Sequence, residues 1–303
     1  PAAPARLLVS GADARGQDVS GVDAPRIDAR EADALLELAV EAATTAGALL
    51  AERVRHGAEH HVSAKSTPTD LVSEADLASE RAIRELLAQR RPHDGFIGEE
   101  GDHDEGSSGL SWVVDPLDGT INFLFGIPEW CVSVAVRDRE GTVAGAVYDP
   151  NRDELFSATR YGRPTLVGPR GEVELSGSTR DGELATAMVA TGFAYGADVR
   201  AAQAKVLARL LPRVRDVRRF GSAALDLTWT AAGRYDAYFE RSVKQWDVAA
   251  GALICERAGL RVLELPAHEQ LPWGILAARP ALAEALLELV GGLDVAARDI
   301  PVS

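Results

Sequence analysis

The spacing of apolar residues along the chain predicts several amphipathic helices. Near the start of the chain, leucines and alanines recur at the three- and four-residue spacing of one helical face. A second such segment follows shortly afterwards, and four more lie in the second half. The expected helices cover about residues 32–54, 74–89, 199–211, 222–232, 247–258 and 281–289.

Between residues 130 and 157 the pattern changes and predicts strands. Apolar positions alternate with small or polar ones, and turns rich in Asp, Gly and Pro separate the runs at about 131–136, 143–148 and 155–156. This arrangement is typical of an antiparallel meander. The second half alternates strands with helices, so we expect a mixed α and β enzyme core without an internal repeat.

Length and composition fit one large domain. The chain has 303 residues, of which 46% are hydrophobic, and can bury a sizeable core in two tightly joined halves. We place these halves at about residues 31–185 and 186–303. Residues 1–30 are rich in Ala, Gly, Asp and Pro, with weak periodicity, and are expected to form a mobile arm.

The charge of the chain argues against a nucleic-acid partner. It has 46 acidic and 32 basic residues and a pI of about 4.9, whereas nucleic-acid binding usually requires a basic face. One local group of basic residues is expected to be the solvated face of a strand. This group consists of Arg213, Arg215, Arg218 and Arg219.

Cellular location is read from cysteines and apolar runs. Cys131 and Cys255 lie in apolar stretches and are expected to be buried free thiols, which fits a reducing cytoplasm. No apolar run is judged long enough to span a membrane, and the N-terminal residues do not resemble a signal peptide. We therefore expect a cytoplasmic protein without a membrane partner.

The most informative motif follows the apolar run at residues 110–114. Asp115 and Asp118 come directly after this run, and Gly119 and Thr120 follow. Two carboxylates about 4 Å apart repel each other by about 1 kcal/mol in water and by roughly 4 kcal/mol at an effective dielectric constant near 20, unless a cation lies between them. Hard oxygen ligands without a cluster of His or Cys favour Mg²⁺ over Zn²⁺.

Backbone conformation supports the same interpretation of this motif. Pro116 favours an extended residue before it, which lets the Leu117 carbonyl turn towards the carboxylates. Gly119 allows close approach of the backbone, and Thr120 can begin a short helical turn through Phe123, whose N–H groups would attract an anion such as phosphate. The alternative is an ordinary acidic turn, since Asp-Pro and Asp-Gly are common turn dipeptides.

Two segments upstream carry further acids. Residues 96–101 form a short apolar run that ends in two glutamates. Residues 65–72, which include Asp70, precede a helix whose Ser73 and Asp76 resemble a capping box.

A fourth segment lies near the end of the chain. Residues 238–240 end in an acid, and residues 245–252 begin an Ala-rich helix with Asp247 in its first turn and Gly259 placed like a C-terminal cap. An acid in the first turn also has a purely structural explanation, because it suits the helix dipole.

Together, the four segments resemble the inositol monophosphatase family of Mg²⁺-dependent, lithium-sensitive phosphatases, and in particular its bacterial, actinobacterial-like inositol-1-monophosphatase branch. The resemblance covers roughly residues 31–290. It rests on Gly-Glu-Glu, Asp-Pro-Leu-Asp-Gly-Thr-Ile-Asn-Phe and Trp-Asp-Val-Ala-Ala-Gly in this order. It implies an α+β fold, a layered α-β-α-β-α sandwich, and a homodimer.

The resemblance also assigns roles to individual residues. It implies two or three Mg²⁺ ions in each active site. The ligands would be Glu99, Asp115, the Leu117 carbonyl, Asp118 and Asp247, with Glu99, Asp115 and Leu117 at the first ion and Asp115, Asp118 and Asp247 at the second. The catalytic residues would be Asp70, Glu99 and Thr120. The substrate-binding residues would be Lys65, Asp118, Gly119, Thr120, Gly192, Phe193, Ser222, Ala223, Glu240 and Asp247.

The sequence departs from the family pattern at two places. Residues 161–168 replace a Gly-X-Gly-Ala stretch and its following Asn-Gly, so this loop is expected to differ in shape. Lys244 stands where some members have His, which makes the rim of the pocket more basic.

The implied chemistry is hydrolysis of inositol 1-phosphate by a metal-activated water that attacks phosphorus in line, with Asp70 and Thr120 holding the proton. One alternative is the same chemistry on phosphoadenosine phosphate, histidinol phosphate or fructose bisphosphate, because the acids do not distinguish these esters. Another is a non-catalytic metal-binding scaffold or regulatory partner. A degenerate set of acids would be typical of that class, and here every matching ligand position is still an acid.

Overall fold

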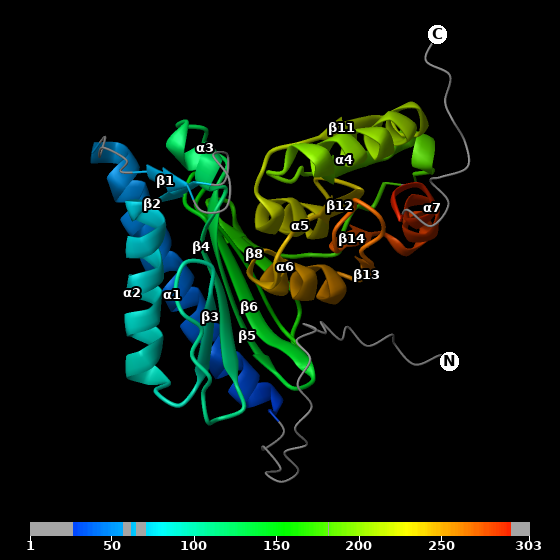
Figure 1. The fold of residues 1–303 in the computed structure, drawn as a ribbon. Coiled ribbons are helices and arrows are strands. Elements are labelled where there is room, and N and C mark those ends of the chain that lie inside the picture. Colours follow the sequence, from blue (N-terminus) through cyan, green and yellow to red (C-terminus); the bar gives the residue numbers. More distant parts are fainter. Residues whose placement is uncertain (1–26, 57–61, 65–70, 181, 292–303) are drawn as a thin grey trace, which may run out of the picture.

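A computed structural model describes residues 27–56, 62–64, 71–180 and 182–291 (Figure 1). Lys65, Asp70 and residues 1–26 of the predicted arm lie outside this part. Ile27 is buried, and its carbonyl accepts a hydrogen bond of 2.7 Å from the Tyr161 hydroxyl.

The larger sheet contains seven strands in the order β3-β4-β5-β6-β7-β8-β9. Only β3 and β4 run parallel, and every later pair is antiparallel, which confirms the predicted meander. The strands are β3 (Gly95–Gly98), β4 (Ser111–Asp118), β5 (Cys131–Asp138), β6 (Gly141–Asp149), β7 (Glu154–Thr159), β8 (Thr165–Gly168) and β9 (Gly171–Glu174).

The smaller sheet contains five strands in the order β11-β10-β12-β14-β13, with β11, β10 and β12 parallel and the other pairs antiparallel. A separate hairpin joins β1 (Val62–Ala64) to β2 (Leu71–Ser73). The predicted division near residue 185 falls between the two sheets. The strands of the second sheet are β10 (Met188–Thr191), β11 (Asp216–Arg218), β12 (Ala237–Arg241), β13 (Arg261–Leu265) and β14 (Gly274–Ala278).

Helices cover both sheets and fill the space between them (Figure 1). One pair packs on the outer face of the larger sheet, a second pair lies between the sheets, and a third covers the smaller sheet. The predicted α-β-α-β-α sandwich is therefore confirmed. The pairs are α1 (Ala29–His56) with α2 (Glu74–Arg90), α5 (Ala223–Ala231) with α6 (Gln245–Arg257), and α4 (Ala197–Leu210) with α7 (Pro280–Val290).

Three short helical segments complete the described structure. Helix α3 (Thr120–Leu124) follows β4 directly, as expected for residues 120–123. The 3₁₀ turns η1 (Leu184–Thr186) and η2 (Leu211–Arg213) flank the start of the smaller sheet and the end of α4.

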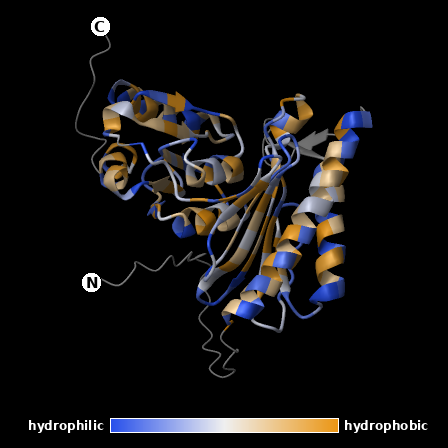
Figure 2. Cartoon of the chain, turned by 180° about the vertical axis from the view of Figure 1, so that it is seen from behind, coloured by the Kyte–Doolittle hydropathy of each residue, from blue (hydrophilic) through white to orange (hydrophobic). Residues whose placement is uncertain are grey.

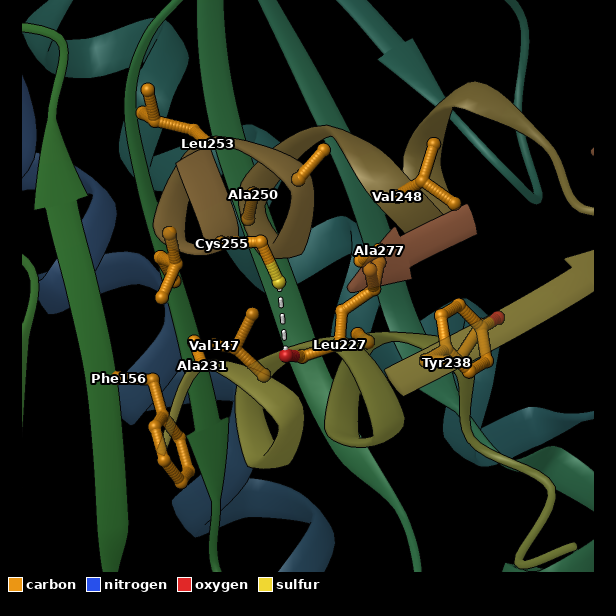
Figure 3. Close-up of a cluster of buried hydrophobic side chains, with 14 of the residues drawn as sticks. Val147, Phe156, Leu227, Ala231, Tyr238, Val248, Ala250, Leu253, Cys255 and Ala277 are labelled. Carbon is orange, nitrogen blue, oxygen red and sulfur yellow. Dashed lines mark hydrogen bonds between the residues drawn. The ribbon is translucent and has the colours of Figure 1, made fainter. Parts of the chain in front are cut away.

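The central strands of the larger sheet, β4 to β7, are largely buried on both faces because their side chains alternate between two cores. Trp112 and Val114 of β4 face α1 and α2, whereas Val113 faces α5 and α6. Apolar residues predominate along these strands, and the helices beside them carry both hydrophobic and hydrophilic segments (Figure 2). In the central layer, the buried Cys255 thiol of α6 donates a 3.1 Å hydrogen bond to the Leu227 carbonyl of α5 (Figure 3). Both cysteines are free and buried, as predicted.

Helix α1 is longer than predicted and corrects the expectation about membrane-spanning segments. Among the described residues, α1 is long and apolar enough to cross a membrane. Length and composition alone are weak evidence for a membrane span, because a buried core helix of a globular protein can share both. Nine residues of α1, among them Leu35 and Leu50, are buried, and this stripe belongs to the core beneath the larger sheet.

The group of four arginines does not form one solvated strand face. Arg218 lies in β11 and pairs with Asp216 at 2.6 Å, while Arg213 ends a 3₁₀ turn. Arg219 follows the strand and lines a pocket, because β11 is only three residues long and the chain turns at Gly221, where φ is +92°.

Candidate active site

Strand β4 delivers the predicted motif to one end of the larger sheet. Its pairing with β5 shifts register between Asp115 and Asp118, and the Leu117 N–H donates a 3.0 Å hydrogen bond back to the Asp115 carboxylate. The chain then turns through Gly119 at a φ of +101°, where a Cβ atom would lie 2.7 Å from the Glu129 carbonyl oxygen. Only glycine fits this turn, which ends the strand and begins α3.

Three carboxylates meet at this point from three different elements. Glu99 follows β3, Asp115 lies in β4, and Asp247 lies in the first turn of α6. One carboxylate oxygen from each residue lies within 4.8 Å of the corresponding oxygens of the other two. Among the residues that the structure describes, these three form the set of acidic, His or Cys side chains that could together hold a metal ion. The sequence-predicted positions therefore converge although Glu99 and Asp247 belong to opposite halves of the chain.

Burial and mutual repulsion make this cluster costly when it is fully ionised. Burial, and then the charges of Glu99, Asp118 and Asp247, raise the pKa of Asp115 well above its ordinary value. Burial, and then the charges of Glu99 and Asp118, likewise raise the pKa of Asp247. A hard divalent cation among these oxygens would remove that cost, so the donor set fits Mg²⁺.

Asp118 is held by the second half of the chain. One of its oxygens accepts hydrogen bonds from the Ser222 hydroxyl at 2.7 Å and from the Ala224 N–H at 2.6 Å. Burial raises its pKa to about 6, against the opposing effect of these hydrogen bonds. Asp118 is not part of the compact set of three carboxylates. Because one of its oxygens already accepts two hydrogen bonds, its predicted role as a metal ligand would fall to the other oxygen.

The Thr120 hydroxyl is hydrogen bonded to an acid that was predicted only as a helix-capping residue. Its Oγ1 lies 2.9 Å from Oδ1 of Asp76 and 3.1 Å from the Leu117 carbonyl oxygen. Asp76 is fully buried in the first turn of α2. The family resemblance implied that Asp70 and Thr120 together hold the proton of the attacking water. Asp70 lies outside the described residues. The side-chain partner of Thr120 within them is Asp76, which was not predicted as a site residue because an acid at this position resembles a helix-capping residue.

The opposite wall of the site comes from β12 and the loop after β10. The Tyr238 hydroxyl donates a 3.0 Å hydrogen bond to Glu240, and burial raises the pKa of Glu240 to about 7. A Cβ atom at Gly192 would lie about 2.0 Å from the Glu240 carboxylate, so glycine is what lets this carboxylate occupy its position.

These groups line a cavity of about 270 Å³. Most of the predicted residues lie on its surface. Gly192 lines a smaller neighbouring cavity, and Ser222 is buried behind the wall, where it holds Asp118. The lining includes Glu99, Asp115, Leu117, Asp118, Gly119, Thr120, Phe193, Ala223, Glu240 and Asp247.

Three cationic side chains line this cavity, and two of them make its rim basic. The third, Arg241, is buried, and its guanidinium donates hydrogen bonds to backbone carbonyls. Lys244 lies at the start of α6, and the exposed Arg219 lies with its guanidinium 6.0 Å from the centre of the Phe193 ring. The Arg219 charge opposes the rise in the pKa of Glu240. Lys244 was predicted at the rim, whereas Arg219 was not, because its neighbouring arginines suggested a solvated strand face.

Comparison with known proteins agrees with the fold and the site. The family model described as "Inositol monophosphatase family" matches residues 31–293. The inositol-1-monophosphatase SuhB of Mycobacterium tuberculosis is 46% identical over 232 residues, which cover 75% of this chain and 80% of that protein. The Nus factor SuhB of Pasteurella multocida is 40% identical over 260 residues, covering 84% and 95% respectively.

A solved structure agrees as well. The extragenic suppressor protein suhB of Bartonella henselae superposes with a TM-score of 0.77 at 33% identity, over 85% of this chain and 98% of that one. The chain therefore belongs to the inositol monophosphatase family, and a phosphatase is the class of protein that the fold and relatives support.

Proposed function

We propose that this protein is a Mg²⁺-dependent phosphomonoesterase that hydrolyses inositol 1-phosphate. The observation that carries the proposal is the convergence of Glu99, Asp115 and Asp247 in one cavity, next to a hydroxyl paired with a buried acid. The 46% identical mycobacterial relative is named an inositol-1-monophosphatase, which supports the choice of substrate.

The metal centre would use the oxygens on this wall. Glu99, Asp115, Asp247, the Leu117 carbonyl and the second oxygen of Asp118 are the candidate ligands for two or three ions. Bound Mg²⁺ would neutralise the acids, bind phosphate oxygens and lower the pKa of a bound water. Lithium sensitivity, predicted from the resemblance, stays part of the proposal.

The protein's own residues would place the substrate and hold the proton. The backbone N–H groups of Gly119 and Thr120 would bind phosphate oxygens as α3 begins. We assign the proton of the attacking water to the Thr120 hydroxyl and Asp76, which are already hydrogen bonded. Glu240 would bind a hydroxyl of the inositol ring, and with a pKa of about 7 it can donate or accept near neutral pH.

A second candidate substrate class is favoured by the basic rim. Arg219 and Lys244 lie at the same cavity as the acids. A small ester with a second anionic group, such as fructose bisphosphate or phosphoadenosine phosphate, would gain from these charges. Histidinol phosphate would not, because its amine is cationic.

The remaining proposals concern partners and location. The protein would act in the cytoplasm as a homodimer, without nucleic acid or membrane. Exposed Phe125 and Ile127, in the loop after α3, are apolar and available to a second copy. Light scattering of the purified protein tests the dimer.

A regulatory role is the alternative to catalysis, because one relative is named a Nus factor. The retained acids favour catalysis.

A substrate panel tests the proposed activity. Phosphate release is measured at saturating Mg²⁺ from inositol 1-phosphate, fructose 1,6-bisphosphate, adenosine 3′,5′-bisphosphate and histidinol phosphate. We expect the highest kcat/KM for inositol 1-phosphate. Release from another ester alone would overturn the substrate assignment, and no release from any of them by folded protein would contradict the phosphatase proposal.

A further inference from the structure

The turn that presents Glu99 wraps around a buried carboxylate that is not part of the metal cluster. Glu80 lies two turns into α2 and is 5% exposed. One of its oxygens accepts a 2.8 Å hydrogen bond from the backbone N–H of Glu100, the residue directly after Glu99. The turn is therefore fixed to α2 through the peptide adjoining the candidate ligand.

Two glycines show how closely the turn fits this carboxylate. A Cβ atom at Gly98 would lie 2.3 Å from Oε2 of Glu80, and one at Gly101 would lie 2.5 Å from Oε1. Neither glycine has a left-handed φ, so the backbone conformation alone does not require glycine there. Their missing side chains leave the space in which the Glu80 carboxylate lies against both ends of the turn.

An arginine one helical turn further along α2 completes the support. Arg84 lies 3.5 Å from Oε1 of Glu80, donates a 2.8 Å hydrogen bond to the Asp102 carbonyl and pairs with the Asp104 carboxylate. Its guanidinium also stacks over the Phe96 ring at 4.0 Å. The segment from β3 to Asp104 is thus tied to one face of α2.

The same helix face contacts the rest of the candidate site. Ser79 donates a 2.7 Å hydrogen bond to the Pro116 carbonyl of β4, and Asp76 holds Thr120. Glu80 is the member of this row that contacts the Glu99 turn. Because a carboxylate ligand must be held in position before the ion arrives, a fixed turn lowers the cost of assembling the cluster.

We propose that Glu80 is a positioning residue for Glu99: its carboxylate sets the turn at Gly98–Gly101 and thereby the affinity of the site for divalent cations. This inference rests on the proposed function, because it assumes that Glu99 is a metal ligand. It adds a residue that lies outside both the three-carboxylate cluster and the lining of the candidate cavity.

The test is Mg²⁺ binding measured by calorimetry without substrate, beside phosphate release as a function of Mg²⁺ concentration. Glu80→Ala removes the acceptor, and we expect its midpoint for Mg²⁺ to rise about tenfold or more. Glu80→Gln keeps an oxygen that can accept the Glu100 N–H, and we expect a midpoint within about threefold of wild type, since the acceptor is what matters.

Two controls on the same helix separate positioning from general stability. Glu85 is exposed, so Glu85→Ala is expected to leave the midpoint unchanged. Leu87 is buried, so Leu87→Ala is expected to lower the melting temperature without moving the midpoint.

Gly98→Ala, which would displace the Glu80 carboxylate from the other side, is expected to raise the midpoint as Glu80→Ala does.

The outcomes distinguish this inference from the proposed function. If wild-type protein binds Mg²⁺ and folded Glu80→Ala and Gly98→Ala bind it equally well, the positioning role is wrong and the metal centre stands. The positioning role is also wrong if Leu87→Ala raises the Mg²⁺ midpoint as much as Glu80→Ala does, because the effect would then follow from general destabilisation. If wild-type protein does not bind Mg²⁺ at all, the metal centre itself is contradicted, and the inference fails with it.

Discussion

Single residues at the site differ in how far the sequence reveals them. The acids at 99, 115 and 118 follow apolar runs, so the burial of each strand identifies the carboxylate at its end. Asp76 shows no such contrast, because an acid in a first helical turn is already explained by the helix dipole. Its partner Thr120 lies 44 residues away, and only the packing of α2 on β4 brings them together.

The pairing of Thr120 with Asp76 predicts a specific loss of turnover. Thr120→Val keeps the shape of the side chain but removes the hydroxyl, so kcat should fall by about 10²- to 10⁴-fold. Thr120→Ser keeps the hydroxyl and should retain most of the activity. Steady-state kinetics at saturating Mg²⁺ checks both variants, and equal activity of Thr120→Val and wild type would exclude a proton-holding role for this pair.

Arg219 and Arg218 form a matched pair for testing selectivity. Arg219 lines the cavity, whereas its neighbour Arg218 pairs with Asp216. Arg219→Gln should lower kcat/KM for bisphosphate esters by about three- to tenfold more than for inositol 1-phosphate, since a charged contact is worth roughly 1 kcal/mol or more. Arg218→Gln should leave this ratio unchanged. A ratio that is the same in all three proteins would remove Arg219 from substrate selection.

Helices and strands were predictable where their patterns are strong. The helices fall within a few residues of their predicted bounds, and β5, β6 and β7 extend the expected runs by one to three residues at most of their ends. Strand β9 was not predicted, because all four of its residues are exposed and show no alternation. Strand β10 has only four residues, too few for a periodicity to emerge, whereas β11 lies where the arginine-rich segment was expected to form a strand. The order of strands in each sheet depends on contacts between distant segments.

Close packing of α6 on the larger sheet predicts a destabilising substitution. A Cβ atom at Gly145 of β6 would lie 2.8 Å from the Ala250 Cα atom, so Gly145→Ala should lower the free energy of unfolding by about 1–3 kcal/mol. The control is Gly168→Ala, where the nearest atoms lie at 3.4 Å and the change should stay within about 0.5 kcal/mol. Urea unfolding monitored by circular dichroism measures both, and equal stabilities would show that α6 has room to move.

The molecule as a whole joins its two halves at the acidic cavity. Asp118 of β4 is hydrogen bonded to Ser222 and Ala224, and Asp247 of α6 meets Glu99 and Asp115. The resemblance of motifs implied this layered arrangement, whereas periodicity indicated only a mixed α and β core. Because the joint contains buried acids, its stability should depend on pH when no metal ion is bound.

Glu240 provides the clearest test of that dependence. Its pKa is raised from 4.5 to about 7 in the folded protein, so the unfolded chain ionises first as pH rises. The stability is therefore fully present below about pH 4.5 and is lost as the pH approaches 7. In chelator, wild type should lose up to about 3 kcal/mol relative to Glu240→Gln over this range, and less where solvent reaches the carboxylate. Parallel stability curves for the two proteins would contradict the raised pKa.

The proposed function depends on the converging carboxylates binding divalent cations that the reaction requires. The most direct measurement is a Mg²⁺ titration of wild type and Asp247→Asn, following both binding heat and phosphate release from inositol 1-phosphate. Wild type should bind Mg²⁺ and release phosphate in step with it, whereas folded Asp247→Asn should bind more weakly and lose turnover at moderate Mg²⁺. Undiminished turnover of Asp247→Asn, or phosphate release by wild type in excess chelator, would contradict a metal-dependent reaction at this site.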